Sequence, residues 1–214
     1  MATYSTSEKT RQAFIKATGE LAAERGFSDI SIRLIAERAG ENISGIHYHF
    51  GSKEKLFEEV VRAATKKHRE NPSSKIFQSF QNELNTPEGQ SKALKAVIHG
   101  FIVAVFSPKN PWWHSYIPYQ IMQSENPLQK ILKEEIITPD VTAIREFVKR
   151  VKPEFGNEKV MLYTKIIQGS IIMHTHDIED GLLGSGRKYS LEYLQELERV
   201  TIRQNQFLLG LPFL

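Results

Sequence analysis

Residues 31–56 read SIRLIAERAGENISGIHYHFGSKEKL, a pattern typical of two short helices joined by a tight turn and followed by the start of a third. Ser31 can cap the first helix by accepting a backbone N–H bond. Gly40 can end it, because glycine tolerates the left-handed conformation that a helix end often needs. Asn42 can cap the second helix, which is hardly two turns long before residues 50–51 break it. Helices this short cannot bury their apolar side chains alone and must pack against the helices on either side. The pattern therefore predicts a helix-turn-helix whose second helix, held by its neighbours, is free to enter a DNA groove.

The rest of the chain keeps a helical pattern, and no stretch alternates with a strand period. A first helix is expected over about residues 7–25, where Gly26 ends it and Phe27 fills the gap to the next helix. The later helices are expected at about 53–70, 86–106, from 110, from 126, 138–151, 153 to 174 or 176, and 190–209. Residues 177–188 are expected to form a loop, because three glycines fall within them. The prediction is an all-α protein.

Composition sets broad limits on the function. The 214 residues are 40% hydrophobic and 25% charged, which are ordinary values for a folded globular chain. The net charge of +3 permits a polyanionic partner without requiring one. The absence of cysteine excludes disulfides, thiolate zinc sites and cysteine nucleophiles. We expect a cytoplasmic protein without a membrane partner, because neither a signal peptide nor an apolar run of spanning length is visible.

Three groups of residues carry a resemblance to a known family. They are Leu21-Ala-Ala-Glu-Arg-Gly-Phe27, Ile35-Ala36 with Ala39-Gly40, and Tyr48-His49-Phe50 with Ser52-Lys53-Glu54 and Leu56. With these features, residues from about 10 to 57 resemble the DNA-binding domain of the tetracycline-repressor (TetR) family of one-component transcriptional regulators. The chain departs from the pattern at two places. His47 stands where the family usually has a tyrosine, and Glu41-Asn42 replaces the usual Val-Ser.

The resemblance implies the domain organisation. Residues 1–52 are expected to form a three-helix helix-turn-helix DNA-binding domain. Residues 53–214 are then a larger helical domain for effector binding and dimerisation, and the helix of about residues 53–70 connects the two.

The candidate DNA contacts gather around the helix-turn-helix. They are Ser31, Arg33, Asn42, Ser44, Gly45, His47, Tyr48, His49 and Lys53. Arg33 occupies the place from which a residue of this family reaches a base, and a guanidinium matches guanine O6 and N7; the alternative is a plain surface arginine. Lys53 adds an ammonium to the free amides of a helix start, which suits phosphate.

The short second helix leaves several alternatives open. Ser44 and Gly45 have small side chains that let the backbone approach bases, or Gly45 is simply tolerated there. His47 and Tyr48 can contact phosphate or a thymine methyl group. Adjacent helical positions do not share a face, so one of the two can pack inward instead. His49 either supports a phosphate contact or belongs to the core.

The C-terminal part is expected to dimerise and to hold an effector, as the resemblance implies. The helices of residues 158–176 and 190–209 have broad apolar faces that suit either an intersubunit four-helix bundle or the monomer core. A dimer places two recognition helices one DNA turn apart, so the partner is expected to be double-stranded DNA with an inverted-repeat operator.

The effector-pocket candidates mix aromatic walls with polar tips. They are His99, Trp113, Tyr116, Tyr119, Met122, Gln168 and His174. Such a mixture suits a small-molecule site, whereas an aromatic stripe at helical spacing is equally typical of core. No cofactor or metal is expected, since His174 and His176 are two residues apart and point different ways on a helix.

These features predict a sequence-specific DNA-binding transcriptional regulator, a repressor released by a small-molecule effector. The alternative is a helical DNA-binding or protein-interaction module without an effector. An enzyme is not expected, because the chain has no phosphate loop, nucleophile elbow or His-Glu-x-x-His pattern.

Overall fold

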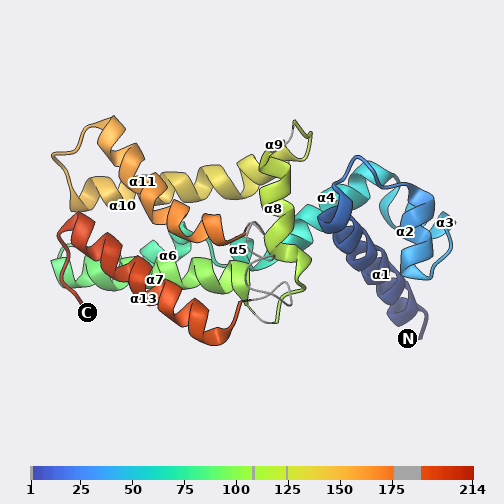
Figure 1. The fold of residues 1–214 in the computed structure, drawn as a ribbon, viewed down its shortest axis with the longest axis horizontal. Helices are drawn as coiled ribbons and strands as arrows, with labels where there is room; N and C mark the ends of the chain where they lie inside the picture. Colours follow the sequence, from blue (N-terminus) through green and yellow to red (C-terminus); the bar gives the residue numbers. More distant parts are fainter. Residues whose placement is uncertain (1, 108, 124, 176–188) are drawn as a thin grey trace. The chain divides into compact units, whose positions relative to one another are not determined.

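The computed structural model describes residues 2–107, 109–123, 125–175 and 189–214, and every regular element within these ranges is helical (Figure 1). The predicted all-α fold is therefore confirmed. The chain separates into two compact units. One contains Met1–Lys66 and Trp113–Leu132, and the other contains Lys67–Trp112 and Lys133–Leu214. The boundary expected between residues 52 and 53 is not where these units divide, because the segment after residue 53 and a later segment both pack with the helix-turn-helix.

The first unit is built around its longest helix, α1. Its elements are α1 (Ala2–Arg25), α2 (Ile32–Ala39), α3 (Ser44–Phe50), α4 (Lys53–Ala64), α8 (Trp113–Gln123) and α9 (Gln129–Leu132). α1 packs against α2, α3, α4 and α8. It supplies Phe14 and Leu21, which are fully buried. Phe27 fills the gap after α1 as expected, because its ring centroid lies 4.9 Å from that of Phe57 on α4.

Two helix boundaries in this unit differ from the expected ones. α1 begins at Ala2 rather than near residue 7, since no glycine or proline interrupts the chain before Gly19. The helix that starts at Lys53 stops at Thr65, and a separate short helix, α5 (Lys66–Glu70), follows it. At the break, the Thr65 hydroxyl donates a 2.9 Å hydrogen bond to the Val61 carbonyl, a contact that often accompanies a bend in a helix.

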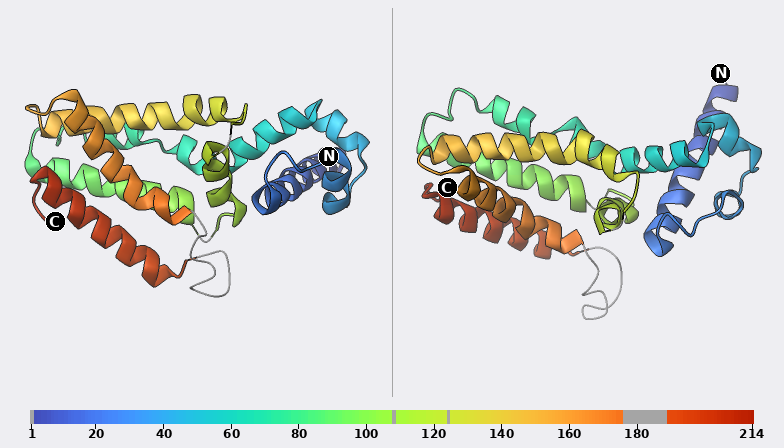
Figure 2. Two further views of the ribbon diagram at one scale, coloured as in Figure 1. Left: turned by 45° about the horizontal axis from the view of Figure 1, so that its top comes forward. Right: turned by 90° about the horizontal axis from the view of Figure 1, so that it is seen from above.

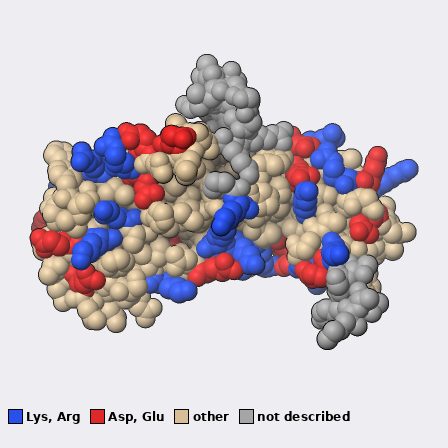
Figure 3. Space-filling view, turned by 90° about the horizontal axis from the view of Figure 1, so that it is seen from below, with Lys and Arg blue, Asp and Glu red and all other residues tan. Residues whose placement is uncertain are grey.

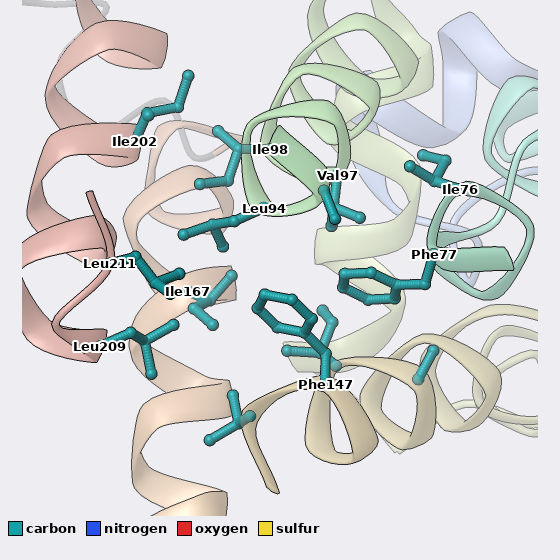
Figure 4. Close-up of a cluster of buried hydrophobic side chains, with 14 of the residues drawn as sticks. Ile76, Phe77, Leu94, Val97, Ile98, Phe147, Ile167, Ile202, Leu209 and Leu211 are labelled. Carbon is teal, nitrogen blue, oxygen red and sulfur yellow. The ribbon is translucent and has the colours of Figure 1, made fainter. Parts of the chain in front are cut away.

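The second unit is a helical bundle with one continuous apolar core. Besides α5, its elements are α6 (Ser73–Ser79), α7 (Pro87–Phe106), the π-helical turn η1 (Lys133–Ile137), α10 (Thr138–Val151), α11 (Asn157–Ile172), the 3₁₀ turn η2 (Met173–Thr175) and α13 (Leu191–Leu209). Figure 4 shows Leu94, Ile98, Ile167 and Ile202 of this core between the helices, and all of them are buried. Phe77 stacks on Phe147 with ring centroids 4.6 Å apart.

Two helix starts of the second unit lie where the sequence predicts them, near residues 86 and 190, and each has a side-chain cap. Thr86 accepts a 3.0 Å bond from the Gly89 amide, and Ser190 accepts a 3.1 Å bond from the Tyr193 amide. α11 begins at Asn157 rather than near Pro153, because Lys149 Nζ binds the carbonyls of Pro153 and Phe155 and holds that segment as a turn. The expected loop over 177–188, and His176, lie outside the described residues.

Asp140, in the first turn of α10, joins three helices of the second unit. It is 1% exposed, accepts a 3.0 Å bond from the Ser73 amide, and pairs with His68 Nε2. One buried carboxylate therefore ties α5 and the start of α6 to α10. Such a group needs these partners, because an unpaired buried charge is strongly destabilising.

Surface charge and hydropathy are unremarkable at the scale of the whole chain. Basic and acidic side chains are interspersed on the face shown in Figure 3. Within the described part of the chain, no helix has the length and apolar character needed to cross a membrane.

Candidate nucleic-acid interface

The turn between α2 and α3 is set by local hydrogen bonds. Ser31 Oγ accepts a 3.1 Å bond from the Leu34 amide at the start of α2, as expected for a cap. Gly40 adopts φ +67° at the end of the helix. The Gly40 amide then donates to the Glu37 carbonyl, and the Glu41 amide donates to the Ala36 carbonyl. This pair of bonds is the usual way in which a helix ends at a left-handed glycine.

Asn42 organises the start of α3 from outside the helix. Its side-chain oxygen accepts a 2.9 Å bond from the Ser44 amide and a 2.8 Å bond from the Ser44 hydroxyl. The helix itself begins at Ser44 rather than directly after Asn42. The capping role expected of Asn42 is therefore met by a turn that precedes the helix, and the exposed Ser44 oxygen keeps its capacity to accept a bond.

The inner side of α3 is anchored on α1. Ile46 and Phe50 are 0% and 7% exposed, and the Phe50 ring meets the edge of Phe14 at 6.2 Å. Gly45 also faces this contact, because a Cβ added there would lie 2.9 Å from Phe14 Cε2. Packing therefore explains the glycine at position 45, since a larger side chain would push α3 away from α1.

The outer side of α3 presents polar and aromatic side chains to solvent. Ser44 and His47 are exposed, and Tyr48 is 81% exposed. Both His47 and Tyr48 point away from the core, so the alternative in which one of them packs inward is wrong. His49 is half-buried, with its ring 4.9 Å from that of Tyr48. An exposed tyrosine at the tip of a rigidly seated short helix is a feature typical of a binding surface.

Arg33 and Arg38 on α2 differ in what they bind. Arg38 donates two bonds to the Glu24 carboxylate, at 3.2 and 3.1 Å, and these raise the pKa of its guanidinium. Arg33 is exposed and makes no ion pair with any residue that the structure describes. Its guanidinium is therefore available to an external partner.

The start of α4 lies directly after α3. Ser52 caps it by accepting a 3.2 Å bond from the Lys55 amide. The Lys53 ammonium lies 5.2 Å from the centre of the Phe57 ring, which holds the side chain close to the helix start. Hydrogen bonds from its own backbone amide and from Ser52 lower the pKa of Glu54. This helix start therefore carries a cation and an ionised carboxylate side by side.

Bracing residues that the sequence did not reveal hold α1 against α4. Arg11 on α1 pairs with Glu59 on α4, and its guanidinium lies 5.5 Å from the centre of the Phe50 ring. Arg62 binds the same Glu59 at 3.2 Å. The sequence holds no signal for the first pair, because its partners are 48 residues apart.

The proposed effector-pocket residues are divided between the two units. Trp113, Tyr116, Tyr119 and Met122 all lie on α8 in the first unit. Trp113 is 2% exposed and Met122 is 50% exposed, so they belong to opposite sides of the helix.

The other three candidates lie in the second unit. His99 on α7 is largely exposed and lies 3.0 Å from a carboxylate oxygen of Glu198. His174 Nδ1 lies 2.8 Å from the Tyr193 hydroxyl, and Gln168 is half-buried on α11. Among the described residues, no group of three or more His, Asp or Glu side chains is arranged to hold a metal ion. Effector binding by these residues stays a prediction.

Comparison with known proteins shows which family this region of the chain resembles. Residues 14–60 match the family described as bacterial regulatory proteins, tetR family. The HTH-type transcriptional regulator SrpR from Pseudomonas putida is 28% identical over 115 residues, which are 53% of this chain and 48% of SrpR. The matched region thus spans about half the length of this curated relative.

Solved structures match over most of the chain. HlyIIR, a hemolysin II transcriptional regulator, superposes with a TM-score of 0.61 at 18% identity, covering 91% of this chain and 97% of its own. A transcriptional regulator from Aquifex aeolicus VF5 gives a TM-score of 0.56 at 19% identity, covering 93% and 99%. At these identities the likeness shows a shared fold, in which an N-terminal helix-turn-helix is followed by a larger helical part.

Proposed function

We propose that this chain is a member of the tetR family of bacterial regulatory proteins, whose pattern residues 14–60 match, and that it is a sequence-specific DNA-binding transcriptional regulator. One observation carries the proposal. α3 is anchored by Ile46 and Phe50, while Ser44, His47 and Tyr48 on its other side are open to solvent. A short helix seated in this way can enter the major groove, which is wide enough to admit it.

The proposed contacts divide by chemistry. Arg33, at the start of α2, suits a bidentate contact to guanine. His47 and Tyr48 suit phosphate oxygens or a thymine methyl group, and Gly45 faces Phe14 of α1. Lys53 and the start of α4 suit a phosphate, although the ionised Glu54 beside them reduces the attraction. Ser31, Asn42 and His49 support these groups by holding the turn and the end of α3.

We further propose that the protein acts as a homodimer through α11 and α13. The two helices pack against each other and run side by side in the views of Figure 2. They leave large apolar side chains in solvent. On α11 these are Met161 and Leu162, on η2 Met173, and on α13 Leu191, Val200 and Phe207. Large apolar side chains left in solvent on packed helices are typical of an interaction site. A symmetric pair presents two copies of α3, which predicts an inverted-repeat operator.

The regulatory part of the proposal is repression relieved by a small molecule. The free dimer occupies a promoter, and a ligand that prefers the non-binding conformation releases it. A preference of about 5 kcal/mol is enough to reverse a strongly biased equilibrium. The candidate contacts are Trp113, Tyr116, Tyr119 and Met122 in the first unit, and His99, Gln168 and His174 in the second. A DNA-binding module without an effector is the second candidate, favoured because His99 and His174 already have Glu198 and Tyr193 as partners within the protein.

Selection of bound sequences from a random pool of double-stranded DNA tests the proposal directly. We expect enrichment of an inverted repeat whose half-sites are about one helical turn apart. Affinity for that sequence should fall steeply as salt rises, because phosphate contacts release counterions. Failure to enrich any sequence would contradict the proposed function. Screening small molecules against the selected complex then separates an effector-controlled regulator, whose complex some ligand dissociates, from a constitutive one.

A further inference from the structure

Trp113 fits into a space that a glycine leaves on α1. The indole is 2% exposed. A Cβ built on Gly19 would lie 2.5 Å from Trp113 Cδ2 and 2.6 Å from Cε2 and Cε3. Real Cβ contacts are essentially never this short, so the ring lies directly on the α1 backbone and requires glycine there.

A second contact, a hydrogen bond, joins the same pair of helices. Gln120 Nε2 donates a 3.0 Å bond to the Ala23 carbonyl of α1. Gln120 lies two turns after Trp113 on α8, and Ala23 lies one turn after Gly19 on α1, so each pair shares a helix face. Together the two contacts define a seam between α1 and α8, and α4 also packs against α8.

The seam is held by shape rather than by polar bonds to the indole. Trp113 Nε1 and the hydroxyl of Thr18, the residue before Gly19, are both buried without a hydrogen-bond partner in the described structure. A buried polar group left in this state costs about 1–3 kcal/mol. The close fit of the indole on Gly19 must therefore offset that cost.

The same helix carries the contact that seats α3. Phe14 lies between one and two turns before Gly19 and meets both Gly45 and Phe50. α1 therefore contacts both α8 and α3. Because packed interiors have little free volume, a displacement of α1 at α8 is transmitted to α3.

We propose, resting on the proposed DNA-binding function, that Trp113 is a positioning residue for DNA reading. Its ring, lying on Gly19, fixes α1 and thereby the seat of α3. This assignment differs from a wall of an effector pocket, because the ring face is covered by α1.

Tryptophan fluorescence can follow the seam directly. The chain has two tryptophans, so Trp112→Phe leaves Trp113 as the only indole. In this background Trp113 should resist quenching by acrylamide. Adding Gly19→Ala should displace the ring and increase the quenching. Gly169→Ala on α11, where an added Cβ meets nothing within 4 Å, is the matched control and should leave the quenching unchanged.

DNA binding is then measured on the selected operator and on unrelated DNA. We expect Gly19→Ala and Trp113→Leu each to weaken operator binding about tenfold. Affinity for unrelated DNA should stay within about twofold, because that affinity is set by phosphate contacts. The double variant Gly19→Ala/Trp113→Leu should bind no worse than Trp113→Leu alone, since the smaller side chain makes room for the added methyl group. This double variant also replaces Gly19→Ala if the single variant does not fold by circular dichroism.

The outcomes separate the two proposals. If the unchanged protein binds the operator and all three variants bind it equally well, the positioning role is wrong and the proposed function stands. Equal losses on operator and unrelated DNA would also contradict positioning, because they indicate general destabilisation. If the unchanged protein binds no DNA, the proposed function fails and the positioning role fails with it, whatever the quenching shows.

Discussion

Arg33 and Arg38 lie on one short helix, yet their surroundings assign them different roles. Arg38 is held by Glu24 through two hydrogen bonds, which orients its guanidinium along the protein surface. Arg33 projects into solvent. Lys53 is intermediate, because its ammonium lies 5.2 Å from the centre of the Phe57 ring and forms no ion pair with any residue that the structure describes. At the residue scale, therefore, what a cation can bind is decided by which anions or rings already surround it.

Arg33→Ala should weaken binding to the selected operator by about 1–3 kcal/mol and relax the preference at one base position. The reason is the loss of a bidentate contact that no other residue replaces. Affinity measured over a panel of single-base operator variants checks both effects. Arg145→Ala, which removes an exposed arginine from α10, outside the proposed dimer helices, should leave the panel unchanged. A full base preference in the Arg33 variant would contradict a base contact.

Lys53→Gln should weaken binding to every DNA sequence alike. The substitution removes a phosphate-binding charge but keeps a stem that can lie on Phe57. We expect the slope of log affinity against log salt to become shallower by about one. Binding isotherms at four or more salt concentrations measure it. The exposed Lys133 of η1, changed to Gln, is the control, and an identical slope in the two variants would mean that Lys53 contacts no phosphate.

At the scale of elements, α2 and α3 are short, so the capping contacts at their ends contribute much of their stability. Ser31 and Gly40 define α2, Asn42 prepares the first turn of α3, and Ser52 starts α4. Each cap satisfies backbone groups that a helix of two turns cannot satisfy internally. The angle between α2 and α3 therefore depends on a few capping groups and on one left-handed glycine.

Gly40→Ala should lower the free energy of unfolding by about 1–2 kcal/mol, because an L-residue at φ +67° brings its Cβ close to the backbone. Urea denaturation followed by circular dichroism measures the change. Gly169→Ala offers a matched control, since Gly169 lies in the interior of α11 with open space around its missing Cβ. That control should be neutral or slightly stabilising. Equal stability of the Gly40 variant and the control would show that the left-handed turn does not limit this region.

At the scale of the whole molecule, the chain returns to its first unit after leaving it. Residues 113–132 pack with the helix-turn-helix, although residues 67–112 of the other unit come between them in sequence. A buried apolar core holds the second unit together, while α11 and α13 keep apolar side chains in solvent. A monomer leaves these apolar side chains in solvent, whereas a dimer through α11 and α13 would bury them.

Phe207→Asp should shift the protein from dimer to monomer, because Phe207 is 74% exposed and a carboxylate cannot be buried in an apolar interface without a large cost. Analytical ultracentrifugation at micromolar concentration measures the mass. The monomeric variant should also lose its preference for two half-sites over one. Phe213→Asp, at a position that is 60% exposed but lies beyond α13, should remain dimeric. An unchanged mass for the Phe207 variant would place the interface elsewhere.

The sequence by itself determined the local features of this protein. Ser31, Gly40, Thr86 and Ser190 end or begin helices where the residues alone predict, because caps act within a single turn. The helical period was likewise enough to predict the all-α fold, and the spaced motifs near residues 21–56 lie within the segment that matches the tetR family.

Only the tertiary structure decided which contacts form between segments that are far apart in the chain. It placed Trp113 on Gly19, turned Gly45 toward Phe14 and buried Asp140 beside His68, its partner 72 residues away. An aromatic residue on a helix has the same local pattern whether it faces a ligand or another helix. Packing between distant segments chooses between these outcomes, and no property of the neighbouring residues encodes that choice.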